Sequence, residues 1–464
     1  MRGEKLQNRL LERRLKGPGW SQQQALDPGY RRWTRWLLYG GILALMILPA
    51  NLLVLLGIPY NLPGGSPFIK IHPSSYLIFL AFGAYLAQRP FQQSLHGVAE
   101  QKPIVWIYPL VASLVTVLTV IRFGISGVAF YIDGLIVPGV LAWLLLSESE
   151  AFRRGAFHLI LVVIFLNAVL GIFEAATGMR LLPYLIAGES HREEFFRSAA
   201  LASHPLESAG RTVPVLLASL VLPSRVFLIL IPILLLGLLG FGSRSALIIG
   251  VVCLLILYQR DLMASIRSRT ISVEKTMGSL LLGFLMFLVS LLMIFSLDLG
   301  TRIIETLYWD QSASARVESI LMLRHLSLEE WWFGSGPEGV KNLTQIRMGW
   351  FNFENFWVIL LIQLGVIQLI FFTVAFLFWM AHLVQEAAFN IRLSALAFLI
   401  IASGSDILAT KTTNLSILVV TVIGAMAYPP KREASHVKVI RRGASLRVRS
   451  ALRSGASSVR PSDG

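Results

Sequence analysis

Arg244 occupies the position in this sequence that most clearly indicates chemistry. It lies in the short segment 241–246, Phe-Gly-Ser-Arg-Ser-Ala, and long apolar runs flank that segment on both sides. A charged side chain in such a place must either bind an anion or extend to a polar interface. We expect Arg244 to bind an anionic group, with anchoring at a membrane interface as the alternative.

A second group of polar residues covers positions 189–211. It contains Arg197, then the sequence Ser-His-Pro in which His204 precedes Pro205, and finally Arg211. Charged groups next to apolar runs are costly, so they indicate a functional site more often than a passive surface. Arg197, His204 and Arg211 are therefore candidate site residues.

The long segment 298–354 carries the third group. Arg316, Arg324 and His325 recur there at helical spacing among apolar residues, which predicts an amphipathic helix. The sequence Gly-Ser-Gly follows, in which Gly334 and Gly336 allow the backbone to approach a ligand closely. An interfacial helix followed by a flexible turn is the alternative interpretation.

Glu354 and Asn355 stand where this long segment meets the next apolar run. A carboxylate at a membrane edge is partly desolvated, which raises its pKa and suits it to act as a general base. The alternative is that Glu354 complements the positive end of a helix. Asn355 would either orient a substrate or cap that helix.

Membrane-spanning helices are the elements that must position these residues. Hydrophobic residues make up 55% of the 464-residue chain and charged residues only 14%, against about 25% charged in a soluble domain. Apolar runs of about 17–25 residues recur, which is the length that a helix needs to cross a bilayer. We predict an all-α polytopic membrane protein with about twelve spans: 36–56, 74–88, 104–120, 126–147, 157–173, 207–222, 225–241, 244–258, 277–297, 355–380, 393–408 and 414–428.

The basic residues indicate the orientation of these spans. The net charge is +15, and most of the excess lies in the predicted tails 1–35 and 429–464. Basic segments next to spans stay in the cytoplasm, so both termini are predicted to be cytoplasmic in a bacterial inner membrane. The transmembrane domain would cover 36–428, with periplasmic loops at 174–206 and 298–354, the larger one between the ninth and tenth spans. This placement explains the charge without a nucleic-acid partner.

The sequence gives little support for a metal centre or a bound cofactor. Cys253 is the only cysteine and lies inside a predicted span, so neither an internal disulfide nor a cysteine-based metal site is expected. Asp-x-Asp and His-Glu-x-x-His motifs are also missing from the chain. We predict no metal and no cofactor.

These motifs, in their order, resemble those of the O-antigen ligase and O-antigen polymerase-like membrane glycosyltransferases of bacterial surface-polysaccharide assembly. Residues 197–205 are similar to the Arg…His-Pro segment before a central span of this family, and 241–247 to its Gly-Ser-Arg turn. Arg316, followed by 334–336, resembles its loop arginine and Gly-x-Gly step. Asn355 and Gly365 resemble the start of the span after that loop, and the resemblance covers roughly residues 190–370.

The resemblance implies transfer of a glycan from a polyprenyl-diphosphate carrier to an acceptor sugar hydroxyl at the periplasmic face, in exopolysaccharide or O-antigen synthesis. The lipid-linked glycan would be the donor substrate. Arg211, Arg244 and Arg316 would stabilise the leaving diphosphate, and Glu354 would accept the proton of the hydroxyl. The expected partners are the acceptor glycan, membrane lipids, and polysaccharide export or chain-length proteins. Further substrate contacts would come from Arg197, His204, Arg324, His325, Gly334, Gly336 and Asn355, with His204 and His325 as alternative bases.

The sequence departs from the family at one important position. Glu354 stands where the ligases have histidine, and Gln368 stands where they usually have a small residue or tyrosine. A carboxylate can still act as a base, so the reaction type survives, whereas the choice between ligase and polymerase stays open and tilts toward polymerase.

Two other function classes also remain open. A transporter or flippase for a polysaccharide precursor is one, because polar groups in spans often line a translocation path. A non-catalytic subunit of an export complex is the other. The polar residues in or near predicted spans are Asp133, Asn167, Glu174, Asp406 and Lys411.

Overall fold

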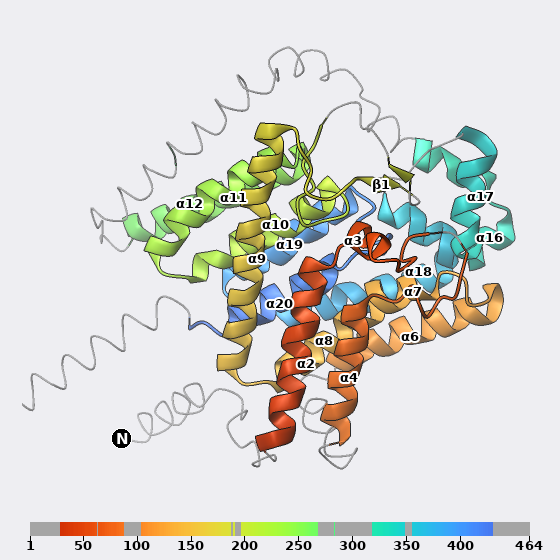
Figure 1. The fold of residues 1–464 in the computed structure, drawn as a ribbon, viewed down its shortest axis with the longest axis horizontal. Coiled ribbons are helices and arrows are strands. Elements are labelled where there is room, and N and C mark those ends of the chain that lie inside the picture. Colours follow the sequence, from red (N-terminus) through yellow and green to blue (C-terminus); the bar gives the residue numbers. More distant parts are fainter. Residues whose placement is uncertain are drawn as a thin grey trace, which may run out of the picture.

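A computed structural model describes residues 28–62, 64–87, 104–186, 189–190, 196–267, 283, 318–348 and 355–429. Nearly all of the regular structure in these residues is helical (Figure 1). The one pair of strands within them is the short antiparallel hairpin of β1 (Leu185–Ile186) and β2 (Glu189–Ser190). The all-α fold class predicted from the apolar runs is therefore confirmed for this part of the chain.

Five helices are long and apolar enough to cross a membrane. They are α6 (Ile104–Phe123), the helix Val128–Ser147, α9 (Glu150–Thr177), the first part of α12 (Arg244–Arg267), and α18 (Phe356–Val384). The helix Val128–Ser147 consists of α7 (Val128–Tyr131), the π-helix η1 (Ile132–Ile136) and α8 (Val137–Ser147). These helices indicate a membrane protein, while the number of about twelve spans and the side on which the termini lie stay predictions.

The other helices correspond to most of the remaining predicted spans. These are α2 (Pro28–Ile47), α3 (Ala50–Leu55), α4 (Pro73–Ala87), α10 (Pro205–Ala218) with η2 (Ser219–Val221), α11 (Ser224–Gly240), α19 (Phe389–Ser403) and α20 (Asn414–Met426). The predicted span 277–297 lies outside the described residues, except Gly283.

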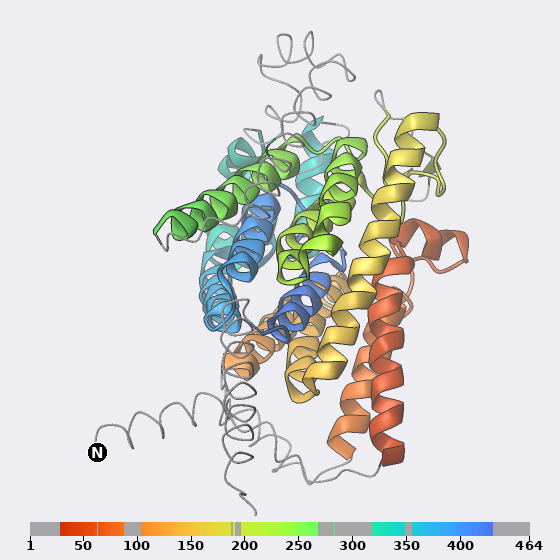
Figure 2. The ribbon, with the colours of Figure 1, turned by 90° about the vertical axis from the view of Figure 1, so that its left-hand side faces the viewer.

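The predicted span 36–56 is wrong as a single helix. Helix α2 already begins at Pro28, inside the predicted tail 1–35, and it ends at Ile47. Pro49 then adopts an extended conformation (φ −66°, ψ 158°) and precedes the separate helix α3. Proline has no N–H to continue a helix, which explains the break. Figure 2 shows α3 turned away from the axis of α2.

Small residues allow close helix contacts in the core. Gly237 of α11 lies against Ala168 of α9, and Gly240 lies against the Gly171 carbonyl, so a Cβ at either glycine would collide with α9. Such contacts between small residues are typical of helices packed in membranes. They fix the end of α11, and hence the turn that leads to Arg244.

Helix α18 contains a break at Gly365, which has φ 72° and ψ 168°. The segment 334–336 packs against this break: Ser335 N and Oγ donate to the Ile362 carbonyl at 2.8 Å and 3.1 Å. The break would otherwise leave that carbonyl without its helical partner. Gln363, next to it, accepts a hydrogen bond from Tyr131 Oη at 3.2 Å, which joins the break to the helix that contains η1.

The described part of the predicted loop 298–354 is also helical. Residues 318–322 form a helical turn and lead into η3 (Leu323–His325), followed by α16 (Leu328–Phe333) and α17 (Gly336–Met348). Ser327 and Glu330 form a reciprocal capping box at the start of α16. Helices α16 and α17 pack against α18 and lie at the right-hand edge of Figure 1.

Candidate functional site

The start of α10 arranges several of the candidate residues. Pro205 occupies the first helical position, where its missing N–H breaks no hydrogen bond. His204 is the N-cap, and its Nδ1 accepts a hydrogen bond from Leu206 N at 3.1 Å. Glu207 Oε2 accepts one from Ser203 N at 3.2 Å. These contacts close the first turn of α10 and fix the side chain of Glu207 against it.

Arg211 lies one turn further along α10, with only 4% of its side chain exposed. Its Nε donates to the Glu207 carbonyl at 3.2 Å, and its Nη2 lies 3.5 Å from Glu207 Oε2. A buried charge is costly unless an opposite charge and hydrogen bonds compensate for it. Glu207 therefore makes the burial of Arg211 tolerable, which sequence reasoning did not recognise.

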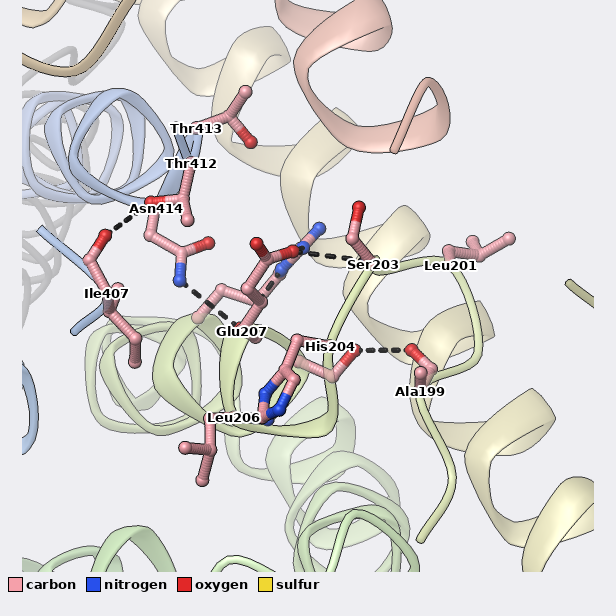
Figure 3. A network of polar contacts seen from close by, with 12 residues as sticks. Ala199, Leu201, Ser203, His204, Leu206, Glu207, Ile407, Thr412, Thr413 and Asn414 are labelled. Atoms are coloured by element: carbon pink, nitrogen blue, oxygen red, sulfur yellow. Dashed lines mark hydrogen bonds and ion pairs between the residues drawn. The ribbon is translucent and has the colours of Figure 1, made fainter. Parts of the chain in front are cut away.

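Two amides from distant parts of the chain complete the group of residues that we call the Glu207 cluster. Asn414, at the start of α20, donates its Nδ2 to the Glu207 carbonyl at 3.4 Å (Figure 3). Asn51 of α3 donates to the Ser203 carbonyl at 3.2 Å. Figure 3 shows the segments around 203–207 and 407–414 on opposite sides of these contacts. The cluster consists of Asn51, Ser203, Glu207, Arg211 and Asn414.

Helix α9 holds the loop that carries Arg197. Asn167 Oδ1 accepts from Leu201 N at 2.9 Å. The buried carboxylate of Glu174 accepts four hydrogen bonds, one of them from Ser198 Oγ at 2.7 Å. The other three come from the backbone N–H groups of Leu181, Ala199 and Ala200, at 2.7 Å, 3.2 Å and 3.0 Å. Asn167 and Glu174, two of the residues that suggested a transporter, thus hold the loop 198–201 in place.

The loop with Arg197 packs against the turn that precedes α12. Ser198 N donates to the Gly240 carbonyl at 3.0 Å. Gly242 has φ +65°, and a Cβ there would lie 3.0 Å from both Cγ and Cδ of Arg197. Glycine thus supplies both the left-handed backbone and the space for the arginine side chain.

Arg211 and Arg244 lie on neighbouring helices. Gly250 of α12 contacts Val213 of α10, further along each helix than Arg244 and Arg211. Arg244 is exposed, whereas Arg211 is buried. Together with the contact between Arg197 and the 240–242 turn, this packing places Arg197 and Arg244 at the beginning of α12, and Arg211 within the neighbouring α10.

His204 lies in a positively charged environment. Burial, together with the charges of Arg197 and Arg180, lowers the pKa of its imidazole from 6.5 to about 4. Arg180 donates to the Arg197 carbonyl at 3.0 Å and lies over the rings of Tyr184 and Phe196. His204 is therefore neutral at pH 7, and Arg180 is a member of this basic region that the sequence motifs did not reveal.

A second group of polar residues, the Asp133 cluster, lies where η1 begins. Asp133 is 3% exposed, and both of its carboxylate oxygens are engaged. Tyr60 Oη donates to Oδ2 at 3.1 Å, Ser75 Oγ donates to Oδ1 at 2.6 Å, and His72 N lies 3.0–3.2 Å from both oxygens. Lys411 completes the cluster: its Nζ donates to the carbonyls of Tyr60 and Lys70 at 2.8 Å and 2.7 Å.

Tyr60 contacts both Asp133 and Lys411 within the Asp133 cluster. Lys411 Nζ lies 4.0 Å from the centre of the Tyr60 ring, while the Tyr60 hydroxyl donates to Asp133. Burial raises the pKa of the Tyr60 phenol well above its usual value, and the negative charges of Asp133 and Glu207 raise it further. Lys411 of the Asp133 cluster and Asn414 of the Glu207 cluster are close in the sequence, at the start of α20, so the two clusters are neighbours.

Gly334 and Gly336, the glycines predicted to approach a ligand, pack against other parts of the protein. A Cβ at Gly334 would collide with the Gln363 carbonyl, and one at Gly336 would lie 2.6 Å from the Phe123 ring. Both have positive φ values, of 79° and 74°. Their small size thus serves the packing of α16 and α17 on α18 and α6, a role different from the predicted approach to a ligand.

Asn355 is the N-cap of α18, with its Oδ1 accepting from Trp357 N at 3.0 Å and Val358 N at 3.3 Å. Of the two roles considered for it, the structure shows the helix cap. Arg324 and His325 lie exposed in η3, on the side of the molecule formed by α16 and α17. Arg316 and Glu354 lie outside the described residues.

Within the described ranges, no group of three or more His, Cys, Asp or Glu side chains is arranged to hold a metal ion. Comparison with known proteins finds no protein-family model that matches this chain and no curated protein that matches it significantly.

Proposed function

We propose that this protein is a membrane glycosyltransferase that moves a glycan from a polyprenyl-diphosphate carrier to a sugar hydroxyl at the outer face of a bacterial inner membrane. The observation that carries the proposal is the packing of two predicted arginines, Arg197 and Arg244, at one turn, with Arg211 on the adjoining helix. Arg197 lies against the 240–242 turn, Arg244 begins the next helix, and Arg211 lies on the neighbouring α10. Arg197 and Arg244 belong to the motifs on which the resemblance to the O-antigen ligases and polymerases rests.

The chemistry requires stabilisation of a diphosphate leaving group. Its negative charge grows as the glycosidic bond breaks, and fixed guanidinium groups bind phosphate oxygens in a planar, bidentate way. Arg244 is exposed at the start of α12, where helix N–H groups add to the positive potential. Arg197, which lies against the turn before α12, would hold the same group.

The proposal is tested with the purified protein in lipid vesicles, a synthetic polyprenyl-diphosphate disaccharide and a free sugar acceptor. Replacing Arg244 with alanine should lower the transfer rate by roughly 100-fold or more, the effect expected when a group that stabilises transition-state charge is removed. The control is Arg154→Ala, which removes an exposed arginine that is paired with Glu150 in the first turn of α9. Full transfer by the Arg244→Ala protein, or no transfer by the wild type, would contradict the proposal.

A transporter or flippase is the second candidate, and the Asp133 cluster favours it. An acidic residue in a π-helix is unusual, because π-helical turns are rare and occur frequently at functional sites. In the same vesicles a transporter would exchange labelled lipid-linked sugar across the bilayer without forming a glycosidic bond. Exchange that continues in Arg244→Ala but stops in Asp133→Asn would favour this alternative.

A further inference from the structure

Glu207 uses only one of its two carboxylate oxygens. Oε2 accepts from Ser203 N at 3.2 Å and lies 3.5 Å from Arg211 Nη2. Oε1 has no hydrogen-bond partner within the part of the chain that the structure describes. The side chain is 15% exposed, so this oxygen can be reached from outside the protein.

Asn414 presents a second acceptor at the same place. Its residue is only 1% exposed, and its Nδ2 is engaged with the Glu207 carbonyl at 3.4 Å. Its Oδ1 is buried and lacks a hydrogen-bond partner among the described residues. Figure 3 shows the Asn414 amide directed toward Glu207. A buried acceptor without a donor is uncommon in native proteins.

The two unpaired oxygens define what the site would bind. Both are acceptors, so they would be satisfied by a ligand that donates hydrogen bonds. A phosphate donates poorly and would be repelled by the Glu207 carboxylate, whereas a sugar hydroxyl donates readily. Arg211 Nη2 lies 3.5 Å from the other oxygen of Glu207 and compensates the charge of the carboxylate, the form that can accept a proton.

Two other buried acids among the described residues, Glu174 and Asp133, lack this feature. The Glu174 carboxylate accepts four hydrogen bonds from the 181–200 region, and Asp133 has donors on both oxygens. An acid that is already saturated cannot bind a hydroxyl without breaking a contact. Glu148 also accepts hydrogen bonds through Oε2 alone. Glu207 is thus distinguished by a neighbour, Asn414, whose buried Oδ1 lacks a partner among the described residues.

We propose that Glu207 and Asn414 bind the acceptor sugar hydroxyl and that Glu207 Oε1 accepts its proton, in place of Glu354. The inference rests on the proposed glycosyl transfer. As the proton passes to Oε1, the acceptor oxygen forms a bond to the anomeric carbon of the donor. The bond from that carbon to the diphosphate oxygen breaks, and its electron pair leaves with the diphosphate. The proton is later released from Glu207 to water.

The test uses the full-length protein in vesicles with the polyprenyl-diphosphate disaccharide and the free sugar acceptor. Glu207→Gln should lower kcat by roughly 100-fold or more, while binding of the lipid-linked donor is unchanged. Asn414→Ala should mainly raise the KM for the acceptor sugar, by about tenfold. The control is Glu150→Gln, the same change at the exposed start of α9, which should transfer at the wild-type rate.

A second variant keeps the test decisive if Glu207→Gln does not fold. Glu207→Asp retains the charge but moves the carboxylate, so the acid limb of the pH–rate profile should shift. A wild-type rate in Glu207→Gln, or an unchanged acid limb in Glu207→Asp, would overturn the inference.

The same experiment separates this inference from the proposed function. If the wild type transfers glycan and Glu354→Gln alone abolishes transfer, the transferase assignment stands and Glu207 is not the base. If the wild type transfers no glycan at all, both proposals fail together.

Discussion

The Asp133 cluster and the Glu207 cluster are neighbours, yet their carboxylates differ in how many of their oxygens accept hydrogen bonds. Asp133 has a donor for each oxygen and holds the 60–75 region through Tyr60, His72 and Ser75. Glu207 has one engaged oxygen and one open oxygen, beside the unpaired Oδ1 of Asn414. The difference teaches that burial alone does not mark a functional acid. A saturated acid holds structure together, and an acid with an open oxygen can take a ligand.

The largest effect is expected at Asp133. Asp133→Ala would leave the Tyr60 hydroxyl, the Ser75 hydroxyl and the His72 N–H without their acceptor. Each buried group that loses its partner costs about 1–3 kcal/mol, so the variant should not accumulate as folded protein. Yield and elution in size-exclusion chromatography measure this. Normal yield and an unchanged melting temperature would show that the cluster does not hold the 60–75 region.

The second-largest loss of stability is expected at Arg211. Arg211→Met leaves the Glu207 carboxylate buried without its opposite charge, which typically costs about 3–5 kcal/mol. The double variant Glu207→Gln, Arg211→Met removes both charges and should regain most of the lost stability. Thermal unfolding of the two single variants and the double variant gives the coupling free energy. Additive losses would contradict the pairing of these side chains.

Acid should destabilise the protein through two buried histidines, His72 beside Asp133 and His204 at the start of α10. Burial lowers the folded-state pKa of His72 and of His204 from 6.5 to about 4. Between these values the unfolded chain binds more protons, so stability is lost as pH falls from 6.5 toward 4. At pH 5 the loss is about 2 kcal/mol for each histidine. Melting temperatures of His72→Asn and His204→Asn should each fall less than that of the wild type as the pH is lowered from 6.5 to 4. A wild-type pH dependence in both variants would contradict this prediction.

Tyr60→Phe should have the smallest effect. It removes one hydrogen bond to Asp133 but leaves those from Ser75 and His72, and the ring still lies under Lys411. A net loss of about 1 kcal/mol is expected, as for a typical hydrogen bond. Urea or thermal unfolding against the wild type measures this difference. A loss as large as that of Asp133→Ala would mean that Tyr60 alone holds the cluster together.

The helices could be predicted from the sequence because hydrophobic length is a local property. Runs such as 104–120 and 157–173 are apolar on every face, and they correspond to α6 and α9. The break between α2 and α3 was missed even though Pro49 marks it. Apolar residues continue on both sides of that proline, and a search for long apolar runs does not stop there.

The candidate site was only partly predictable. The sequence singled out Arg197, His204 and Arg211 as polar residues beside apolar runs, and the structure packs them at the start of α10. It did not reveal Arg180, whose contacts are with the Arg197 carbonyl and the Tyr184 ring. The Gly334-Ser335-Gly336 segment looked like a ligand loop because its partner, the break at Gly365, lies at a distance in the sequence.

By itself the sequence determined that this chain is helical and apolar enough for a membrane, and which charged residues stand beside the apolar runs. Burial of long apolar segments needs no information from elsewhere in the chain. Only the tertiary structure decided which acids are saturated. Glu174 and Glu207 are equivalent as residue types, but the 198–201 loop folds onto Glu174, and Asn414 meets Glu207 from another part of the chain. Hydrogen-bond saturation depends on such distant contacts, which the sequence around each acid does not contain.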